Sequence, residues 1–178
     1  KIDVYGFDTG QGLPKPSDYR DLPHLFKEGH FPMDFDELQA RLKKAKLILG
    51  DVKQTIPNFI KANPAPIAFI SFDLDIYSST KDAFQLLSAD QKILLPMIHC
   101  FFDDIMGYYY SEYNGERLEI SEFNESHQIK KMSPIYGLKY YINQHEKWTE
   151  QIYLAHIFDY ELYDKNDGML QADKLSLK

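Results

Sequence analysis

Short apolar runs recur along the chain and predict its β-strands. Residues 2–7 and 46–49 are short and rich in β-branched or apolar side chains. Residues 67–72 and 93–102 are continuous apolar runs, which are typical of strands buried on both faces of a sheet. Two later strands are predicted within residues 129–135 and 150–160.

Apolar residues at helical spacing mark the segments between these strands. They predict helices over residues 35–45 and 55–62, where Pro57 is tolerable only in the first turn. A third helix is expected to begin with Ser78 or Ser79 as its N-cap, and part of residues 105–127 should be helical. Strands that alternate with helices predict an α/β sandwich around a mostly parallel sheet with an antiparallel late strand.

Composition and charge narrow the class of protein. The 178 residues are 44% apolar and 26% charged, which indicates one globular domain over residues 1–160 and a polar tail over 161–178. The net charge of −7 repels phosphate backbones, so nucleic acid is not the expected partner. No apolar run approaches the roughly 20 residues of a membrane helix. The single cysteine, Cys100, excludes an intrachain disulfide and favours a reducing, cytoplasmic compartment, where a homo-oligomer is compatible with the sequence.

Acidic residues follow four of the predicted strands: Asp8, Asp51, Asp73 with Asp75, and Asp103 with Asp104. An isolated aspartate at such a position usually caps a helix or a turn, and this is the ordinary interpretation of Asp51 taken alone. The carboxyl ends of parallel strands share one edge of a sheet. Carboxylates gathered there repel one another unless a cation or several hydrogen-bond donors lie among them.

The Asp73-Leu-Asp75 segment is the most specific of these signals. In an extended chain, two residues two positions apart point to the same side, so both carboxylates should face one site. Asp103 and Asp104 end the next buried strand, which is expected to be a neighbour in the sheet. Oxygen ligands from Asp73, Asp103 and Asp104 suit Mg²⁺ or another hard divalent cation. The alternative is a pair of capped strand–helix junctions without a metal.

Four motifs give the chain a resemblance to a known family. They are FDTGQGLP at residues 7–14, GDVKQT at 50–55, SFDLDIYSST at 71–80 and FDD at 102–104. In order and spacing they resemble the macrocin and novobiocin type of class I S-adenosylmethionine-dependent O-methyltransferases, from about Val4 to Ile105. The resemblance implies a Rossmann-like fold and metal-assisted transfer of a methyl group to a hydroxyl of a small sugar or natural-product metabolite.

The resemblance also implies roles for the acidic residues. Asp73, Asp103 and Asp104 would bind the divalent metal, and Asp75 would act as the general base. Asp8 would bind the ribose of S-adenosylmethionine, and Asp51 would lie near its adenine.

Two departures from the family pattern are visible. The chain matches the family from its second strand onward, so the Gly-rich loop that holds the methionine end of the cofactor has no counterpart. An open position in the sheet is therefore expected beside residues 4–8. Leu74 replaces the glycine that is usual inside Asp-x-Asp, which leaves the class of substrate open.

Two other functions compete with this interpretation. A non-catalytic remnant or binding domain would keep the fold without the cofactor loop. An Asp-nucleophile phosphatase also places Asp-x-Asp after an apolar strand. That class expects Thr or Val where this chain has Tyr77, and the segment between the two acidic motifs is too short for its core.

Overall fold

The computed structural model describes residues 2–142, 146–161 and 163. Strands β1 (Val4–Asp8) and β2 (Ala45–Leu49) form a parallel pair. A second sheet has the strand order β3-β4-β6-β5. Its strands are β3 (Ile67–Phe72), β4 (Leu94–Phe102), β5 (Lys130–Pro134) and β6 (Ile152–Ile157).

The predicted α/β class is confirmed. β3 and β4 are parallel, whereas β6 is antiparallel to both of its neighbours, β4 and β5. Among the described strands of this sheet, β6 is therefore the one that runs in the opposite direction. Four α-helices occur in the described part of the chain: α1 (Phe35–Arg41), α2 (Val52–Lys61), α3 (Tyr77–Ala83) and α4 (Gly115–Ser126). None of the helices in the described residues is long and apolar enough to span a membrane.

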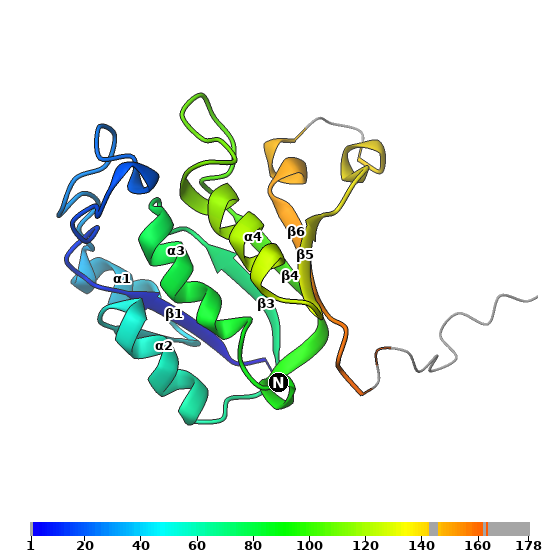
Figure 1. Cartoon of the computed structure of the whole chain (residues 1–178). Helices are drawn as coiled ribbons and strands as arrows, with labels where there is room; N and C mark the ends of the chain where they lie inside the picture. The colour runs from blue at the N-terminus through cyan, green and yellow to red at the C-terminus, as the bar shows by residue number, and fades with distance from the viewer. Residues whose placement is uncertain (1, 143–145, 162, 164–178) are drawn as a thin grey trace, which may run out of the picture.

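Helices α2, α3 and α4 run side by side over one face of the strands (Figure 1). The core lies beneath them, where the rings of Phe72 and Phe102 stack at 4.8 Å and Phe84 packs against both. The prediction that residues 67–72 and 93–102 are buried on both faces is wrong. Phe69 and Met97 are 58% and 49% exposed, because within the described residues the helices cover one face and leave these positions open.

The two sheets are separated by an open position. β1 pairs with β2 and β3 with β4, but β1 and β3 are not hydrogen-bonded to each other. A groove of about 730 Å³ runs between them, lined by residues 2–8 and 65–74, with Val52 and Ile56 of α2 also lining it. This β1–β3 groove agrees with the open sheet position expected from the sequence.

Several element boundaries differ from the sequence prediction. α1 ends at Arg41 and not at residue 45. α2 begins at Val52, capped by Asp51, so Pro57 lies beyond the first turn and inside the helix. Neither Ser78 nor Ser79 is the N-cap of α3, because that position is occupied by Ile76. The predicted polar tail falls almost wholly on residues 162 and 164–178, which lie outside the described residues.

Candidate active site

The carboxyl ends of β3 and β4 bring three acidic side chains together. Asp73, Asp75 and Asp104 each offer a carboxylate oxygen, and these oxygens lie within 4.8 Å of one another. We call these three residues the acidic cluster. The sequence predicted that acids following these two strands would converge, and the parallel pairing of β3 with β4 is the reason that they do.

Asp75 reaches the acidic cluster through a turn and not through an extended strand. β3 ends at Phe72, and Asp75 has a positive φ of 61°. The turn is closed by a hydrogen bond of 2.6 Å that the Ile76 amide donates to the Leu74 carbonyl. A left-handed backbone is unfavourable for most side chains, and aspartate is among the residues that adopt it most often. Such backbone strain gathers at functional sites, which is consistent with a working role for Asp75.

Asp104 is the most firmly held member of the acidic cluster. Its Oδ2 accepts a hydrogen bond from the Asp75 amide at 3.1 Å, and its Oδ1 accepts one from the Tyr110 hydroxyl at 2.8 Å. Its own amide donates to Oε2 of Glu116 at 3.1 Å. Glu116 is fully buried at the start of α4, and its Oε1 has no partner among the described residues. Glu116 therefore belongs to the site, although no sequence motif pointed to it.

Asp103 lies beside the acidic cluster but outside it. The residue is exposed, and its Oδ1 faces the side-chain amide of Gln151 at 3.4 Å. Gln151 is buried and also donates to the carbonyls of Phe102 and Asp103. Consecutive residues at the end of a strand point to opposite sides, so Asp103 diverges when Asp104 turns inward.

The two acids assigned to the cofactor occupy different settings. Asp8 ends β1, lines the β1–β3 groove together with Asp73, and accepts a hydrogen bond of 2.6 Å from the Gly10 amide. Asp51 is exposed, and its Oδ1 caps α2 by accepting from the Lys53 amide at 2.9 Å. The structure therefore places Asp8 near the acidic cluster, whereas Asp51 has the ordinary role of a helix cap.

Burial and mutual repulsion favour the protonated forms of these acids. Desolvation, followed by the charges of Asp104, Asp73 and Asp103, raises the pKa of Asp75 to about 7. Desolvation likewise raises the pKa of Asp73 and Asp104, and it raises that of Glu116 well above its usual range. A carboxyl with a pKa near 7 is suited to act as a general base at neutral pH.

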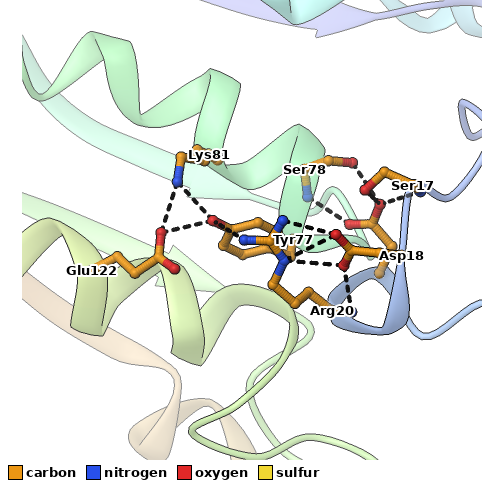
Figure 2. A network of polar contacts seen from close by, with 8 residues as sticks. Ser17, Asp18, Arg20, Tyr77, Ser78, Lys81 and Glu122 are labelled. Carbon is orange, nitrogen blue, oxygen red and sulfur yellow. Dashed lines mark hydrogen bonds and ion pairs between the residues drawn. The ribbon is translucent and has the colours of Figure 1, made fainter.

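A polar network fixes the segment that follows β1 against α3 (Figure 2). The fully buried carboxylate of Asp21 accepts hydrogen bonds from the amide and hydroxyl of Ser78, at 2.7 and 3.0 Å. It accepts two more from the amide and hydroxyl of Ser17, both at 2.7 Å. Asp21 thus supplies the capping group at the start of α3 that the sequence assigned to Ser78 or Ser79.

Tyr77 extends this network towards α4. Its hydroxyl donates to Glu122 at 2.7 Å and accepts from Lys81 at 2.7 Å and from Arg20 at 3.1 Å. The Arg20 guanidinium also lies 4.5 Å from the centre of the Tyr77 ring. These contacts join α3, α4 and the Arg20 turn (Figure 2). Tyr77 follows Asp75 by two residues, so the network fixes the start of α3 next to the acidic cluster.

A cleft of about 680 Å³ opens beside the acidic cluster. Asp75 and Tyr110 form one wall, and residues 25–32 of the segment after β1 supply the rest of the lining. We call it the Asp75 cleft. Several tyrosines follow Asp104 in the sequence, and Tyr110 is the one of them that lines this cleft.

The raised pKa values predict that the folded chain loses stability as the pH rises. A carboxyl whose pKa is higher in the folded state binds its proton more tightly there than in the unfolded chain. Its stabilising effect is therefore complete below the unfolded pKa near 4 and is lost as pH rises through the folded pKa. For Asp75 and for buried Glu119, whose pKa desolvation raises to about 7, this window runs from about pH 4 to 7. We therefore expect the midpoint temperature of thermal unfolding, measured by circular dichroism, to decrease as the pH is raised from 5 to 8.

Two variants serve as matched controls for this prediction. Asp75→Asn and Glu119→Gln should each flatten the pH dependence and raise the unfolding temperature at pH 8, because each removes one buried charge. The wild type and both variants should then gain stability from millimolar Mg²⁺, since Asp73 and Asp104 remain in each of them and Glu119 lies outside the acidic cluster. An unfolding temperature that rises steadily from pH 5 to pH 8 would contradict the prediction.

Comparison with known proteins gave little beyond the fold. A scan against protein-family models and a search of curated proteins both returned no match. Among solved structures, one similar chain is apo CalS11, a TDP-rhamnose 3′-O-methyltransferase of calicheamicin biosynthesis. The identity is 20% and the TM-score 0.44, over 86% of this chain and 58% of that one. The present chain thus spans little more than half of that protein, and at this TM-score the likeness carries no weight for function.

Proposed function

We propose that this chain carries the metal and acceptor side of an S-adenosylmethionine-dependent O-methyltransferase that acts on a hydroxyl group of a small metabolite. The observation that supports this most is the convergence of Asp73, Asp75 and Asp104, in which Asp75 has a pKa of about 7. One acid poised to accept a proton, next to others suited to bind a cation, matches the needs of methyl transfer to oxygen.

The acidic cluster fits a hard divalent cation such as Mg²⁺. Its carboxylate oxygens are close enough to bind one ion. Desolvation, followed by repulsion from nearby carboxylates, raises the pKa of Asp73 and Asp104, and a positive charge would relieve that repulsion. Asp73 and Asp104 are the ligands on which the sequence and the geometry agree. Asp103, the third ligand expected from the resemblance, would contribute mainly through its nearby charge, since its side chain is exposed and faces Gln151.

Asp75 is the residue that would take the proton from the acceptor. A bound cation lowers the pKa of a coordinated hydroxyl, and S-adenosylmethionine supplies the methyl group. Asp75 lines both the acidic cluster and the Asp75 cleft, so a hydroxyl in the cleft can reach its carboxylate. The proton passes to Asp75 as the acceptor oxygen forms its new bond to carbon. The fixed backbone turn at residues 74–76 holds the carboxylate in place for this step.

Asp8 is the residue best placed to contact the methyl donor. A carboxylate at the end of a strand can accept two hydrogen bonds from the vicinal hydroxyls of a ribose. One oxygen of Asp8 is used by the Gly10 amide, and the side chain lines the end of the β1–β3 groove beside Asp73. Asp51 is a weaker candidate for the adenine end, because its carboxylate already caps α2.

Magnesium titration of the chain provides the direct test of the metal site. We expect Asp104→Asn to weaken Mg²⁺ binding by roughly tenfold or more, because the change removes an anionic ligand held inside the acidic cluster. Asp103→Asn should weaken it much less, because this carboxylate is exposed and lies outside the cluster. Isothermal titration calorimetry at pH 8 measures both constants.

The pair of variants also separates the competing ligand sets. Equal losses in Asp103→Asn and Asp104→Asn would favour the ligand set implied by the family resemblance over one formed by the acidic cluster alone. If the wild type and Asp104→Asn bind Mg²⁺ with the same affinity, the acidic cluster is not a metal site and the proposed function fails.

A further inference from the structure

The lining of the Asp75 cleft is largely apolar. Leu25, Phe26, Phe31 and Pro32 line it together with Asp75 and Tyr110. Phe26 is buried, but Phe31 is 66% exposed although it is a large apolar side chain. Phe31 also has a positive φ of 57°, a conformation that is strained for a bulky residue. An exposed aromatic ring held at a cleft rim by a strained backbone is the kind of feature that a bound ligand would explain.

Tyr110 presents its ring, and not its hydroxyl, as a free surface. The hydroxyl donates its proton to Asp104, so towards a ligand it can act only as an acceptor. The ring lines the cleft, as Phe31 does. Aromatic and aliphatic side chains that line a cleft favour a flat apolar ligand over a heavily hydroxylated one, because most hydroxyls of a sugar would lose water without gaining partners.

The side chains that line the cleft disfavour a phosphorylated ligand. No Lys or Arg is among the lining residues, and His30 is the one basic side chain there. Asp75 is one of the lining residues, and the other two carboxylates of the acidic cluster lie next to it. A diphosphate in this cleft would face these acids, and a cation bound in the acidic cluster would have to offset the repulsion, since no lining Lys or Arg does so.

The cleft has fixed walls. The segment that carries residues 25–32 is bound to α3 through Asp21, whose carboxylate accepts hydrogen bonds from Ser78, three residues after Asp75. A backbone hydrogen bond of 2.8 Å from Leu13 to His30 closes the other end of this segment. The fold therefore fixes the distance between the apolar lining and Asp75, and this distance can discriminate between ligands of different size.

We infer that the acceptor hydroxyl is carried on an uncharged aromatic ring, a phenol or a catechol, which binds in the Asp75 cleft between Phe31 and Tyr110 with its hydroxyl at Asp75. This inference rests on the proposed function and adds the class of acceptor. It excludes a nucleoside diphosphate sugar as the group that enters the cleft. The methyl carbon leaves the donor sulfur for the ring oxygen, and the hydroxyl proton passes to Asp75.

Binding of small probes to the chain tests the inference without the methyl donor. Catechol, cyclohexane-1,2-diol and UDP-glucose are titrated at pH 7.5, each with and without Mg²⁺, while backbone amides are followed by NMR. We expect catechol to bind with a dissociation constant on the order of 1 mM, as is typical of a fragment of its size. It should shift the amides of residues 25–32 and 75, and the other two probes should bind at least roughly tenfold more weakly.

Three variants locate the bound probe. Phe31→Asn removes the ring while keeping a residue that tolerates positive φ, and it should weaken catechol binding roughly tenfold. Tyr19→Asn, which removes another exposed aromatic of the same segment outside the cleft, should leave binding unchanged. Tyr110→Phe keeps the ring wall and should also bind catechol. Circular dichroism confirms that each variant is folded.

The outcomes separate this inference from the function on which it rests. Tighter binding of UDP-glucose than of catechol would overturn the aromatic class while leaving a metal-assisted methyltransferase intact. No binding of catechol up to about 20 mM, or equal binding by the wild type and Phe31→Asn, would also overturn it. The magnesium titration of Asp104→Asn tests the proposed function separately.

Discussion

Replacement of Asp75 by asparagine should lower the rate of methyl transfer by about 10² to 10⁴-fold at saturating Mg²⁺ and S-adenosylmethionine. The carboxamide keeps the shape of the side chain and can keep the left-handed turn at this residue, but it cannot take the proton from the substrate hydroxyl. The measurement is the single-turnover rate of methyl transfer to a substrate that the wild type methylates. The wild-type rate should rise with pH, with a midpoint at or below about 7, because a bound cation lowers the pKa of Asp75 from that value.

Glu119→Gln is the matched control for this experiment. Glu119 is a second buried acid whose pKa is raised to about 7, but it lies on α4 and outside the acidic cluster. Its replacement should leave the rate nearly unchanged, so that a loss seen in Asp75→Asn cannot be ascribed to removal of a buried charge in general. If excess Mg²⁺ restores the rate of Asp75→Asn but not that of Asp104→Asn, the roles of base and ligand are reversed. If neither variant slows methyl transfer, this edge of the sheet is not the active site.

The sequence predicted where in the sheet the acidic cluster lies better than it predicted which residues form it. Asp73 and Asp104 could be placed because each follows an apolar strand, and adjacent parallel strands end at one edge. Asp75 was expected to share its side of the site through strand alternation. It does so through a left-handed turn that the residue types do not specify. Asp103 diverges from Asp104 because neighbouring side chains in an extended chain point in opposite directions. Two adjacent aspartates at a strand end therefore do not both face the same site.

The burial of the sheet was the main error in the predicted fold. Continuous apolar runs suggested strands covered on both faces, yet Phe69 and Met97 are exposed on the face opposite α2, α3 and α4. An apolar strand can be buried on both faces, but whether each face is covered depends on elements elsewhere in the chain. The start of α2 was missed for a different reason. Pro57 was expected in the first turn of the helix, whereas Asp51 caps the helix and Val52 begins it.

Glu116 and Asp21 could not be found from the sequence because their partners are distant along the chain. Glu116 reaches the Asp104 amide from the first turn of α4, and no motif links the two. Asp21 lies in a proline-rich segment, where an aspartate looks like an ordinary turn residue. Its contact with Ser78 spans 57 positions, and only the packing of that segment on α3 creates it.

Asp21→Ala should be the most destabilising single change near the site, lowering the free energy of unfolding by about 3 kcal/mol. The carboxylate is fully buried and accepts four hydrogen bonds, two from Ser17 and two from Ser78. Its removal leaves these four donors without their acceptor and takes away the cap of α3. Urea unfolding gives the free energy, and hydrogen exchange shows whether amides of residues 13–32 lose protection before the rest of the chain.

Two further variants distinguish the capping role from a general effect of charge. Asp18→Asn changes a half-buried aspartate of the same turn, which forms an ion pair with Arg20, and it should destabilise the chain much less than Asp21→Ala. Asp21→Asn should fall between the wild type and Asp21→Ala, because an amide oxygen can still accept from one serine while its NH₂ group faces the donors of the other. If Asp21→Ala is as stable as Asp18→Asn, the segment after β1 is not held by this carboxylate. In that case the fixed geometry of the Asp75 cleft must come from the packing of Leu22 and Phe26 against Ile76.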